Sequence, residues 1–311
     1  MNVLIADSLS PEAVERLRAG GAAVDDRSGI EPDELLKAIP NVQALIVRGR
    51  TQVSASLLAA AAQLKVVGRA GVGVDNIDLA AAAACGVAVV NTPVSTSVAV
   101  AELTFALMLA LVREIPRADA AMKQGLWLKK ELEGTELAGK TLGIIGVGNI
   151  GVQVARRAAA FDMQVLGYDP LLDGPTVQSR GAAHVSLDDL YARSDFITLH
   201  LPLLPETRGL LNGGAFAKMK PGVYLVCAAR GDVIAEADLL AALNSGQLAG
   251  AALDVFEKEP PGPSPLVSHP KVVATPHIGA QTAEAQRRAA LDVAEEVLNA
   301  LQGKPLRWQV K

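Results

Sequence analysis

The sequence predicts an α/β protein in which parallel sheets are arranged in two domains. Short β-branched runs alternate with alanine-rich stretches along the chain, an order typical of parallel sheets with helices on both faces. The length of 311 residues exceeds the usual size of one domain. Half of the residues are hydrophobic and 20% are charged, which indicates a chain that buries a core.

Eight runs are predicted to be strands because apolar, mainly β-branched residues fill each of them between turn residues. They are NVLIAD from Asn2, ALIVR from Ala44, KVVGRA from Lys65, TLGIIG from Thr141, QVLGYD from Gln164, FITLHL from Phe196, VYLVCAA from Val223 and KVVATP from Lys271. Apolar residues at helical spacing predict helices between them, for example PEAVERLRAG and AEADLLAALNSG. The second of these ends at Gly246, a typical C-terminal stop.

The predicted domains are discontinuous in sequence. A turn-rich segment meets the apolar run VAVAELTFALMLALV at Val98, and a long helical pattern begins at Thr282. We therefore expect residues 1–97 and 283–311 to form one domain and residues 98–282 to form the other. The apolar run contains Glu102 and is too short to span a bilayer, so it is predicted to be a buried helix.

Composition excludes several classes of function. The net charge of −4 and an aromatic content of 3% argue against nucleic-acid binding. The two cysteines, Cys85 and Cys227, are far apart, so neither a disulfide framework nor a cysteine-rich metal site is expected. The first residues, MNVLIADSLS, lack the basic segment of a signal peptide. We expect a soluble, cytoplasmic protein without a metal.

A glycine-rich turn predicts a dinucleotide site. TLGIIGVGNIG contains the pattern GxGxxG after an apolar strand and before an amphipathic helix. Gly146 permits the tight turn, Gly148 lets the backbone approach a pyrophosphate, and Gly151 allows close packing of helix and strand. The next strand ends at Asp169, which can accept hydrogen bonds from ribose hydroxyls and would repel a 2′-phosphate. No arginine follows it directly, so the sequence favours NAD over NADP.

Catalytic side chains are expected at the carboxyl ends of the later strands, because ligands bind at that edge of a parallel sheet. There the sequence places His200, Arg230, Asp254 with an acidic cluster, and His277. A histidine can exchange a proton near neutral pH, and a carboxylate beside it favours the imidazolium. An arginine can bind a substrate carboxylate through two parallel hydrogen bonds. These parts suit hydride transfer between NAD and a 2-hydroxy acid.

The chain resembles the D-isomer-specific 2-hydroxyacid dehydrogenases over nearly its whole length. The motifs VGRAGVGVDNID, the glycine-rich loop, AARGDVI, ALDVFEKEP and TPHIGA stand in the order seen in that family. The resemblance implies a Rossmann NAD-binding domain, a flavodoxin-like substrate domain and an active-site cleft between them. It implies that His277 is the general acid/base, Glu259 its partner and Arg230 the substrate-binding arginine. It also implies the following contacts with NAD: Gly146, Gly148, Asn149, Ile150, Gly151, Asp169, Ala228, Ala229, Arg230, Asp254, His277, Gly279 and Ala280.

Alternatives remain at several positions. Glu257 is the rival of Glu259 as the partner of His277. We interpret His200 as mainly structural and Asp254 as a group that binds the nicotinamide amide. The other two histidines, His184 and His269, are interpreted as surface or turn residues. Three residues depart from the family pattern and remove hydrogen-bonding groups near the cofactor: Val72, Leu201 and Cys227.

The first domain is expected to bind the anionic groups of the substrate. The backbone N–H groups of Ala70, Gly71, Val72 and Gly73 can form a nest for its carboxylate. Arg48 and Arg69, together with Arg50, can supply positive charge for a phosphate, and Lys129 and Lys130 can add to it or simply be solvated. With the resemblance, these residues favour NAD-dependent oxidation of 3-phospho-D-glycerate to 3-phosphohydroxypyruvate, the entry to serine synthesis.

Two other functions stay open from the sequence. One is a glyoxylate/hydroxypyruvate reductase or another D-2-hydroxyacid dehydrogenase of the same family, and the other is a non-catalytic NAD-sensing binding protein. The resemblance also implies a homodimer, for which the helix from Val98 and its neighbours are the candidate interface. The chain ends soon after the last predicted helix, so no appended regulatory domain is expected.

Overall fold

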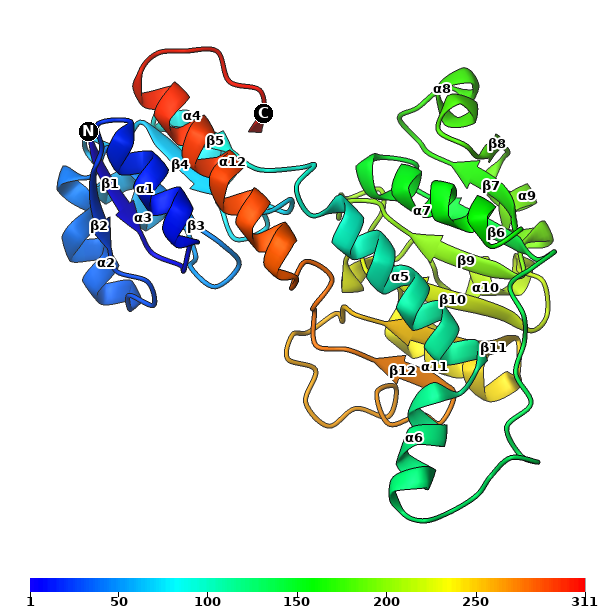
Figure 1. The fold of residues 1–311 in the computed structure, drawn as a ribbon. Helices are drawn as coiled ribbons and strands as arrows, with labels where there is room; N and C mark the ends of the chain where they lie inside the picture. The colour runs from blue at the N-terminus through cyan, green and yellow to red at the C-terminus, as the bar shows by residue number, and fades with distance from the viewer. Residues whose placement is uncertain (311) are drawn as a thin grey trace. The chain divides into compact units, whose positions relative to one another are not determined.

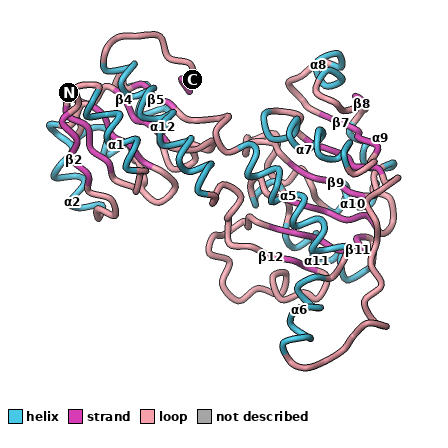
Figure 2. Tube along the Cα trace, in the orientation of Figure 1, coloured by secondary structure: helices cyan, strands magenta, loops and turns pink. Residues whose placement is uncertain are grey.

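The structure, a computed structural model, describes residues 1–310 and divides into two compact units. Unit 1 comprises Met1–Ser97 and the C-terminal segment from Ala280, and unit 2 comprises Val98–Gly279. The second crossing lies three residues before the expected one, because Ala280 and Gln281 bond to residues of unit 1. In both units helices and strands alternate along the chain (Figures 1 and 2).

Unit 1 contains a six-stranded sheet in the order β13-β5-β4-β3-β1-β2. Its strands are β1 Asn2–Ile5, β2 Ala23–Asp26, β3 Ala44–Val47, β4 Val66–Arg69, β5 Ala88–Val90 and β13 Gln309–Val310. All pairs are parallel except that of β13 with β5. Without β13 the strand order is that of flavodoxin, and the order reverses between β1 and β3.

Helices cover both faces of the unit 1 sheet. They are α1 Pro11–Ala19, α2 Pro32–Ala38, the 3₁₀ helix η1 Ile39–Asn41, α3 Ala55–Ala60, α4 Leu79–Ala84 and α12 Ala283–Leu301. The α1 and α12 helices bury their apolar residues against one face, and α2, α3 and α4 do so against the other. A Cβ at Gly68 of β4 would lie 2.6 Å from Val297 and 2.8 Å from Val293 of α12, so glycine is needed for this close approach.

Unit 2 contains a seven-stranded, wholly parallel sheet in the order β12-β11-β10-β9-β6-β7-β8. Its strands are β6 Thr141–Ile145, β7 Gln164–Tyr168, β8 Ala183–His184, β9 Phe196–Leu199, β10 Val223–Cys227, β11 Leu248–Leu253 and β12 Val272–Ala274. This is a Rossmann order with one further strand, and it reverses between β6 and β9.

Two layers of helices enclose the unit 2 sheet (Figure 1). The helices are α5 Ser97–Val112, α6 Ile115–Lys123, α7 Asn149–Ala160, α8 Gly174–Ser179, α9 Leu187–Arg193, α10 Gly213–Lys218, the 3₁₀ helix η2 Gly231–Val233 and α11 Glu236–Ser245. Residues of α5, α7 and α8 share one apolar cluster, and residues of α9, α10 and α11 share another on the opposite face. The α11 helix ends at Gly246 in the left-handed conformation, as predicted. The predicted α/β class with two parallel sheets is confirmed.

No helix in the described part of the chain combines the length and the apolar character that crossing a membrane requires. Residues 1–310 likewise contain no group of three or more His, Cys, Asp or Glu side chains placed to hold a metal ion.

Candidate active site

The glycine-rich turn joins β6 to α7 and leaves open space beside the backbone of Gly148. Gly146 has φ +96°, and a Cβ there would lie within 3 Å of the His200 backbone. A Cβ at Gly151 would lie 2.2 Å from the Gly146 carbonyl oxygen, whereas nothing lies within 4 Å of one at Gly148. No side chain caps the start of α7 at Gly148. The first N–H groups of this helix can therefore bind a pyrophosphate.

Asp169 is held beside this turn. It follows β7, and one carboxylate oxygen accepts a hydrogen bond from the Val147 N–H at 2.9 Å. The other oxygen accepts from the Leu171 N–H, also at 2.9 Å. The carboxylate therefore stands at the carboxyl end of β7, next to the phosphate-binding turn, where a ribose is bound in dinucleotide sites. The geometry suits NAD.

The predicted catalytic residues gather at the carboxyl edge of the same sheet. Arg230 follows β10, Asp254 follows β11 and His277 follows β12, and these three strands are consecutive neighbours. Glu259 lies in the loop after β11. Parallel strands end at one edge of a sheet, so residues far apart in the sequence meet there.

His277 and Glu259 form a hydrogen-bonded pair. The His277 Nδ1 atom lies 2.6 Å from a Glu259 carboxylate oxygen, and the side chains are 50% and 36% exposed. The other Glu259 oxygen accepts from the Phe256 N–H at 3.1 Å. The rival, Glu257, instead exchanges hydrogen bonds with Glu236 at the start of α11. The structure therefore pairs Glu259, and not Glu257, with the imidazole.

The ionised form of Glu259 is favoured. Partial burial would raise the pKa of its carboxyl, but the hydrogen bond and charge of His277, the Phe256 N–H and the charge of Arg230 together lower that pKa. Glu259 consequently stays an anion in mildly acidic solution and can orient the ring through Nδ1. The other ring nitrogen, Nε2, is left for exchange of a proton with a ligand.

Asp254 holds the loop that carries His277. Its carboxylate is almost wholly buried and accepts hydrogen bonds from the Thr275 hydroxyl at 2.6 Å, the Ile278 N–H at 2.9 Å and the Gly279 N–H at 2.8 Å. The backbone of His277 has φ +52°, a left-handed conformation that is uncommon for residues other than glycine. Asp254 thus binds both sides of a strained residue, a role that sequence reasoning missed. Its predicted contact with nicotinamide remains a prediction.

Replacing Asp254 with asparagine should loosen this loop. The amide presents one acceptor oxygen where the carboxylate presents two, so at least one buried N–H or hydroxyl loses its partner. We expect a loss of about 1–3 kcal/mol in the free energy of unfolding, together with a lower kcat. Urea denaturation and steady-state assays check this result. An unchanged kcat in a stable D254N variant would contradict the positioning role.

The turn that follows β10 positions the Arg230 side chain. Its Nη1 donates to the Ala229 carbonyl oxygen at 2.7 Å, and its charge acts on Glu259. A Cβ at the next residue, Gly231, would lie 1.9 Å from the Phe256 carbonyl carbon. Only glycine lets the loops after β10 and β11 approach so closely, which explains the Arg-Gly pair of the motif.

Two other predicted positions in unit 2 are buried and apolar in character. Cys227 is fully buried, and burial raises the pKa of its thiol to about 11, so the residue is a neutral small side chain. Leu201 is also buried. Neither supplies a strong hydrogen bond to a cofactor, as their departure from the family pattern indicates.

The remaining histidines lie outside the His277–Glu259 pair. The His200 ring bonds to the Thr198 hydroxyl at 3.1 Å, and burial lowers its pKa to about 3, so it is neutral. His184 is exposed on β8, and His269 accepts from the Lys271 N–H in a turn. These positions agree with the interpretation of the three residues as structural or surface groups.

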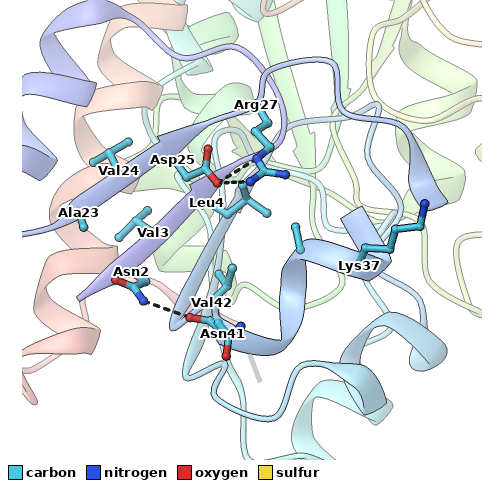
Figure 3. Close-up of a pocket in the computed structure, with 11 residues that line it drawn as sticks. Asn2, Val3, Leu4, Ala23, Val24, Asp25, Arg27, Lys37, Asn41 and Val42 are labelled. Atoms are coloured by element: carbon cyan, nitrogen blue, oxygen red, sulfur yellow. Dashed lines mark hydrogen bonds and ion pairs between the residues drawn. The ribbon is translucent and has the colours of Figure 1, made fainter. Parts of the chain in front are cut away.

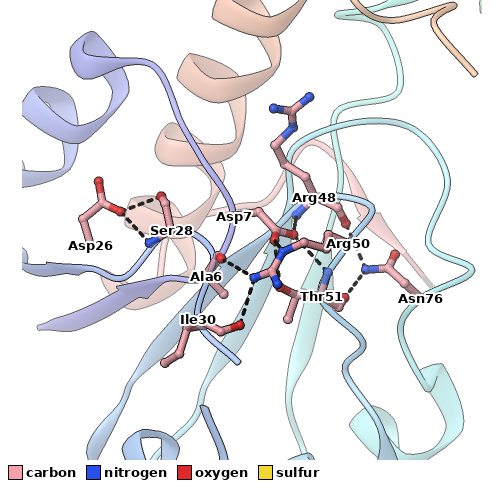
Figure 4. Close-up of polar contacts among 9 residues, drawn as sticks. All are labelled: Ala6, Asp7, Asp26, Ser28, Ile30, Arg48, Arg50, Thr51 and Asn76. Atoms are coloured by element: carbon pink, nitrogen blue, oxygen red, sulfur yellow. Dashed lines mark hydrogen bonds and ion pairs between the residues drawn. The ribbon is translucent and has the colours of Figure 1, made fainter. Parts of the chain in front are cut away.

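In unit 1 the predicted arginines have different environments. A cavity of about 430 Å³ lies at the carboxyl ends of β1 and β3, where the strand order reverses. Seven residues line it: Asp7, Ser8, Ser28, Gly29, Arg48, Gly49 and Arg50. Arg50 donates to Asp7 and to the Ala6 and Ile30 carbonyl oxygens, whereas the Arg48 side chain extends away from that network (Figure 4). Arg48 is the half-buried member of the two, and burial lowers its pKa.

The Arg69–Gly73 loop, which was predicted to form an anion nest, does not offer the Ala70 N–H to a ligand, because that N–H donates to the Val47 carbonyl oxygen at 2.9 Å. Gly71 has φ +143°, and the Arg69 guanidinium lies directly over it. Two bonds from the segment after β5 fix the loop: Asn91 Nδ2 donates to the Val72 carbonyl oxygen at 2.7 Å, and the Thr92 N–H donates to that of Gly71 at 2.9 Å. Asn91 was missed from the sequence because the short strand before it, β5, was not predicted.

A second cavity in unit 1, of about 440 Å³, contains none of the predicted residues. Its one arginine, Arg27, is paired with Asp25 at 2.9 Å (Figure 3). Its lysine, Lys37, bonds to Glu34. The charges of this cavity are thus already matched. Lys129 and Lys130, which were predicted either to reach a phosphate or to be solvated, are exposed in unit 2.

Comparisons with known proteins place the chain in a family. The family model described as "D-isomer specific 2-hydroxyacid dehydrogenase, NAD binding domain" matches residues 105–279. The D-3-phosphoglycerate dehydrogenase of Archaeoglobus fulgidus is 46% identical over 99% of the chain, which covers 58% of that protein. The chain thus spans little more than half the length of this relative.

Solved structures match over the full length. A crystal structure of a Thermus thermophilus protein superposes with a TM-score of 0.91 at 37% identity and covers 100% of both chains. A glyoxylate reductase from Paecilomyes thermophila gives 0.92 at 32% identity and covers 100% of this chain and 98% of its own. The chain belongs to the D-isomer-specific 2-hydroxyacid dehydrogenases and carries their NAD-binding domain.

Proposed function

We propose that the protein oxidises a D-2-hydroxy acid with NAD, using His277 as general base, Glu259 as its positioning partner and Arg230 as the carboxylate clamp. The observation that carries this proposal is the 2.6 Å contact between His277 Nδ1 and Glu259, at the sheet edge that also holds the glycine-rich turn. Nδ1 is occupied by the carboxylate, so Nε2 is the atom that accepts the hydroxyl proton. The bound cofactor supplies the hydride acceptor.

Each protein group has a part in the oxidation. Arg230 fixes the substrate carboxylate and polarises the neighbouring carbon–oxygen bond through its planar fork. As His277 takes the hydroxyl proton, the ring becomes positively charged, and ionised Glu259 stabilises that charge. In the reverse direction the same imidazolium returns the proton to the carbonyl oxygen.

Replacing Glu259 with glutamine tests the pair. The amide cannot stabilise the positive charge that the ring gains when it takes the hydroxyl proton, and it orients the ring less firmly, so kcat should fall by about tenfold or more. Steady-state assays of the oxidation give this rate. An unchanged kcat in E259Q would exclude Glu259 as the electrostatic partner.

We infer 3-phospho-D-glycerate as the substrate and 3-phosphohydroxypyruvate as the product. Arg48 and Arg69 are cations at the carboxyl ends of β3 and β4, close in sequence to the backbone N–H groups of residues 71–73, which were predicted to bind an anion. A substrate with a distal phosphate can bind to these positive charges, and a short 2-hydroxy acid without a second anionic group cannot. The relatives named D-3-phosphoglycerate dehydrogenase support the same choice.

The test is NADH formation with a panel of D-2-hydroxy acids that includes 3-phospho-D-glycerate, D-glycerate, D-lactate and glycolate. We expect the phosphorylated acid to have the highest kcat/KM. Arg48→Ala should raise its KM about tenfold or more with little change in kcat, because a charge-assisted contact to the phosphate is lost.

Other results of the panel assign other functions. A preference for glyoxylate or hydroxypyruvate in the reducing direction would make the protein a reductase of the same family. Negligible turnover of every acid, despite tight NADH binding, would favour an NAD-sensing protein. An unchanged KM in R48A would show that Arg48 does not bind the phosphate.

We also propose a homodimer. Four large apolar side chains are exposed on α6 and directly after it: Ile115, Met122, Leu126 and Trp127. Trp127 is 75% exposed, an unfavourable state for an indole ring in water. Sedimentation as a monomer alone at micromolar concentration would contradict the dimer.

A further inference from the structure

Arg48 has no ion-pair partner among residues 1–310, and its side chain is held by a neutral amide. One guanidinium nitrogen, Nη2, donates to Gln281 Oε1 at 3.2 Å, between positions 233 residues apart in the sequence. The neighbouring Arg50, in contrast, is paired with Asp7 at 3.2 Å. The structure thus gives one of two adjacent arginines a salt bridge and leaves the other without one, although the charge of Asp7 also acts on Arg48.

The backbone of Arg48 is fixed on both sides. Its N–H donates to Asp7 Oδ2 at 2.7 Å, and its carbonyl oxygen accepts from Asn76 Nδ2 at 2.9 Å (Figure 4). Burial would raise the pKa of Asp7, but hydrogen bonds from Arg48, Thr51 and Arg50 outweigh it and hold that pKa below its ordinary value. The anchor therefore remains an anion, and the freedom left to Arg48 lies in its side chain.

Gln281 starts from an equally fixed backbone. The carbonyl oxygen of Ala280 accepts from the Gln286 side chain at 2.7 Å and from the Thr282 N–H at 3.0 Å. The Thr282 hydroxyl then caps α12 by accepting from the Ala285 N–H at 3.2 Å. Gln281 is therefore presented from the rigid start of a 19-residue helix.

The amide at position 281 has a specific electrostatic consequence. It accepts one guanidinium N–H and so restricts the rotamers of Arg48, but it adds no negative charge. A glutamate at the same position would form a salt bridge and neutralise the arginine. The remaining N–H groups of Arg48 keep their full charge for an anionic ligand.

We propose that Gln281 is a specificity-determining positioning residue, which aims Arg48 at the distal anionic group of the substrate without compensating its charge. This inference rests on the proposed function, in which that group is a phosphate. It assigns to Gln281 an effect on the KM of the phosphorylated acid, and none on the chemical step.

The test compares Gln281→Glu, Gln281→Ala and the control Ala283→Glu, which adds the same charge two residues away on the exposed start of α12. In Q281E the KM for 3-phospho-D-glycerate should rise about tenfold or more, while kcat and the KM for NAD stay within about twofold. In Q281A it should rise about threefold, because only the restraint is lost. In A283E it should change by less than about twofold, since an exposed charge that makes no contact is screened.

A double-mutant cycle isolates the contact. In the R48A background, Q281E should raise the KM no further than A283E does, because the arginine that it neutralises is absent. Equal effects of Q281E with and without Arg48, or of Q281E and A283E in the wild-type background, would overturn the inference while leaving the proposed function intact. Absence of wild-type turnover of 3-phospho-D-glycerate would overturn the proposed function and this inference with it.

Discussion

Replacing His277 with asparagine should lower kcat for oxidation by about 10²–10⁴-fold, because no group remains to accept the hydroxyl proton. Asparagine suits the test because His277 has φ +52°, a conformation that asparagine adopts more readily than most residues. The loop should therefore keep its shape, and NADH should bind with nearly unchanged affinity. Steady-state kinetics and NADH fluorescence titration give the two quantities.

A matched control is His184→Asn, which removes an exposed imidazole of the same unit. His184 lies on β8, and His277 follows β12, the strand at the opposite end of the strand order. The H184N variant should leave kcat unchanged. The assignment of His277 as the acid/base would be wrong if H277N kept more than about a tenth of the wild-type kcat, since such a loss is below the range for general-base catalysis.

Arg230→Lys should lower kcat/KM for the hydroxy acid by at least about 100-fold, although the positive charge is kept. An ammonium group cannot form the two parallel hydrogen bonds of a guanidinium, so the carboxylate and the reacting carbon lose their fixed orientation. The affinity for NADH should change little. Arg193→Lys on the exposed end of α9 is the control and should have no effect.

If R230K and R193K gave similar kcat/KM values, the substrate carboxylate would have to be bound elsewhere. The backbone nest around Gly71 would then be the remaining candidate. A loss confined to NADH affinity would instead place Arg230 at the cofactor alone.

The strands that were predicted correctly share one property, which the missed strands β2, β8, β11 and β13 lack; β5 was missed because it has only three residues. All eight predicted runs become strands, because each is dense in β-branched or large apolar residues. The β11 strand was missed because its sequence, LAGAAL, has the alanine content of a helix, and only burial between β10 and β12 makes it extended. β2 ends in two exposed aspartates, and β13 is two residues long and depends on pairing with β5.

Of the site, only the residues that lie near the ends of strands could be predicted from the sequence. Arg230, Asp254 and His277 were found because each lies within three residues of the carboxyl end of a strand of one sheet. The choice between Glu257 and Glu259 depends on the path of an irregular loop, which no periodicity encodes. Gln281 could not be found at all, because its contact with Arg48 joins positions at opposite ends of the sequence.

The same rule, applied to the first domain, would have identified Asp7. Asp7 follows β1 as Arg48 follows β3, and Arg69 ends β4, whereas Asn91 follows β5, a strand that was not predicted. Asp7 and Asn91 both fix the loops on which the predicted anion-binding groups lie. A polar residue at a strand end is therefore informative in either unit, even where no motif surrounds it.

Transfer of deuterium tests the central claim most directly. We propose that a proton leaves the substrate oxygen for His277 while the hydrogen on carbon 2 passes to NAD. With 3-phospho-D-glycerate deuterated at carbon 2, mass spectrometry should find the deuterium in the NADH formed. The H277N variant should form almost no deuterated NADH in the same time. NADH without deuterium, or deuterium released only to water, would contradict the account.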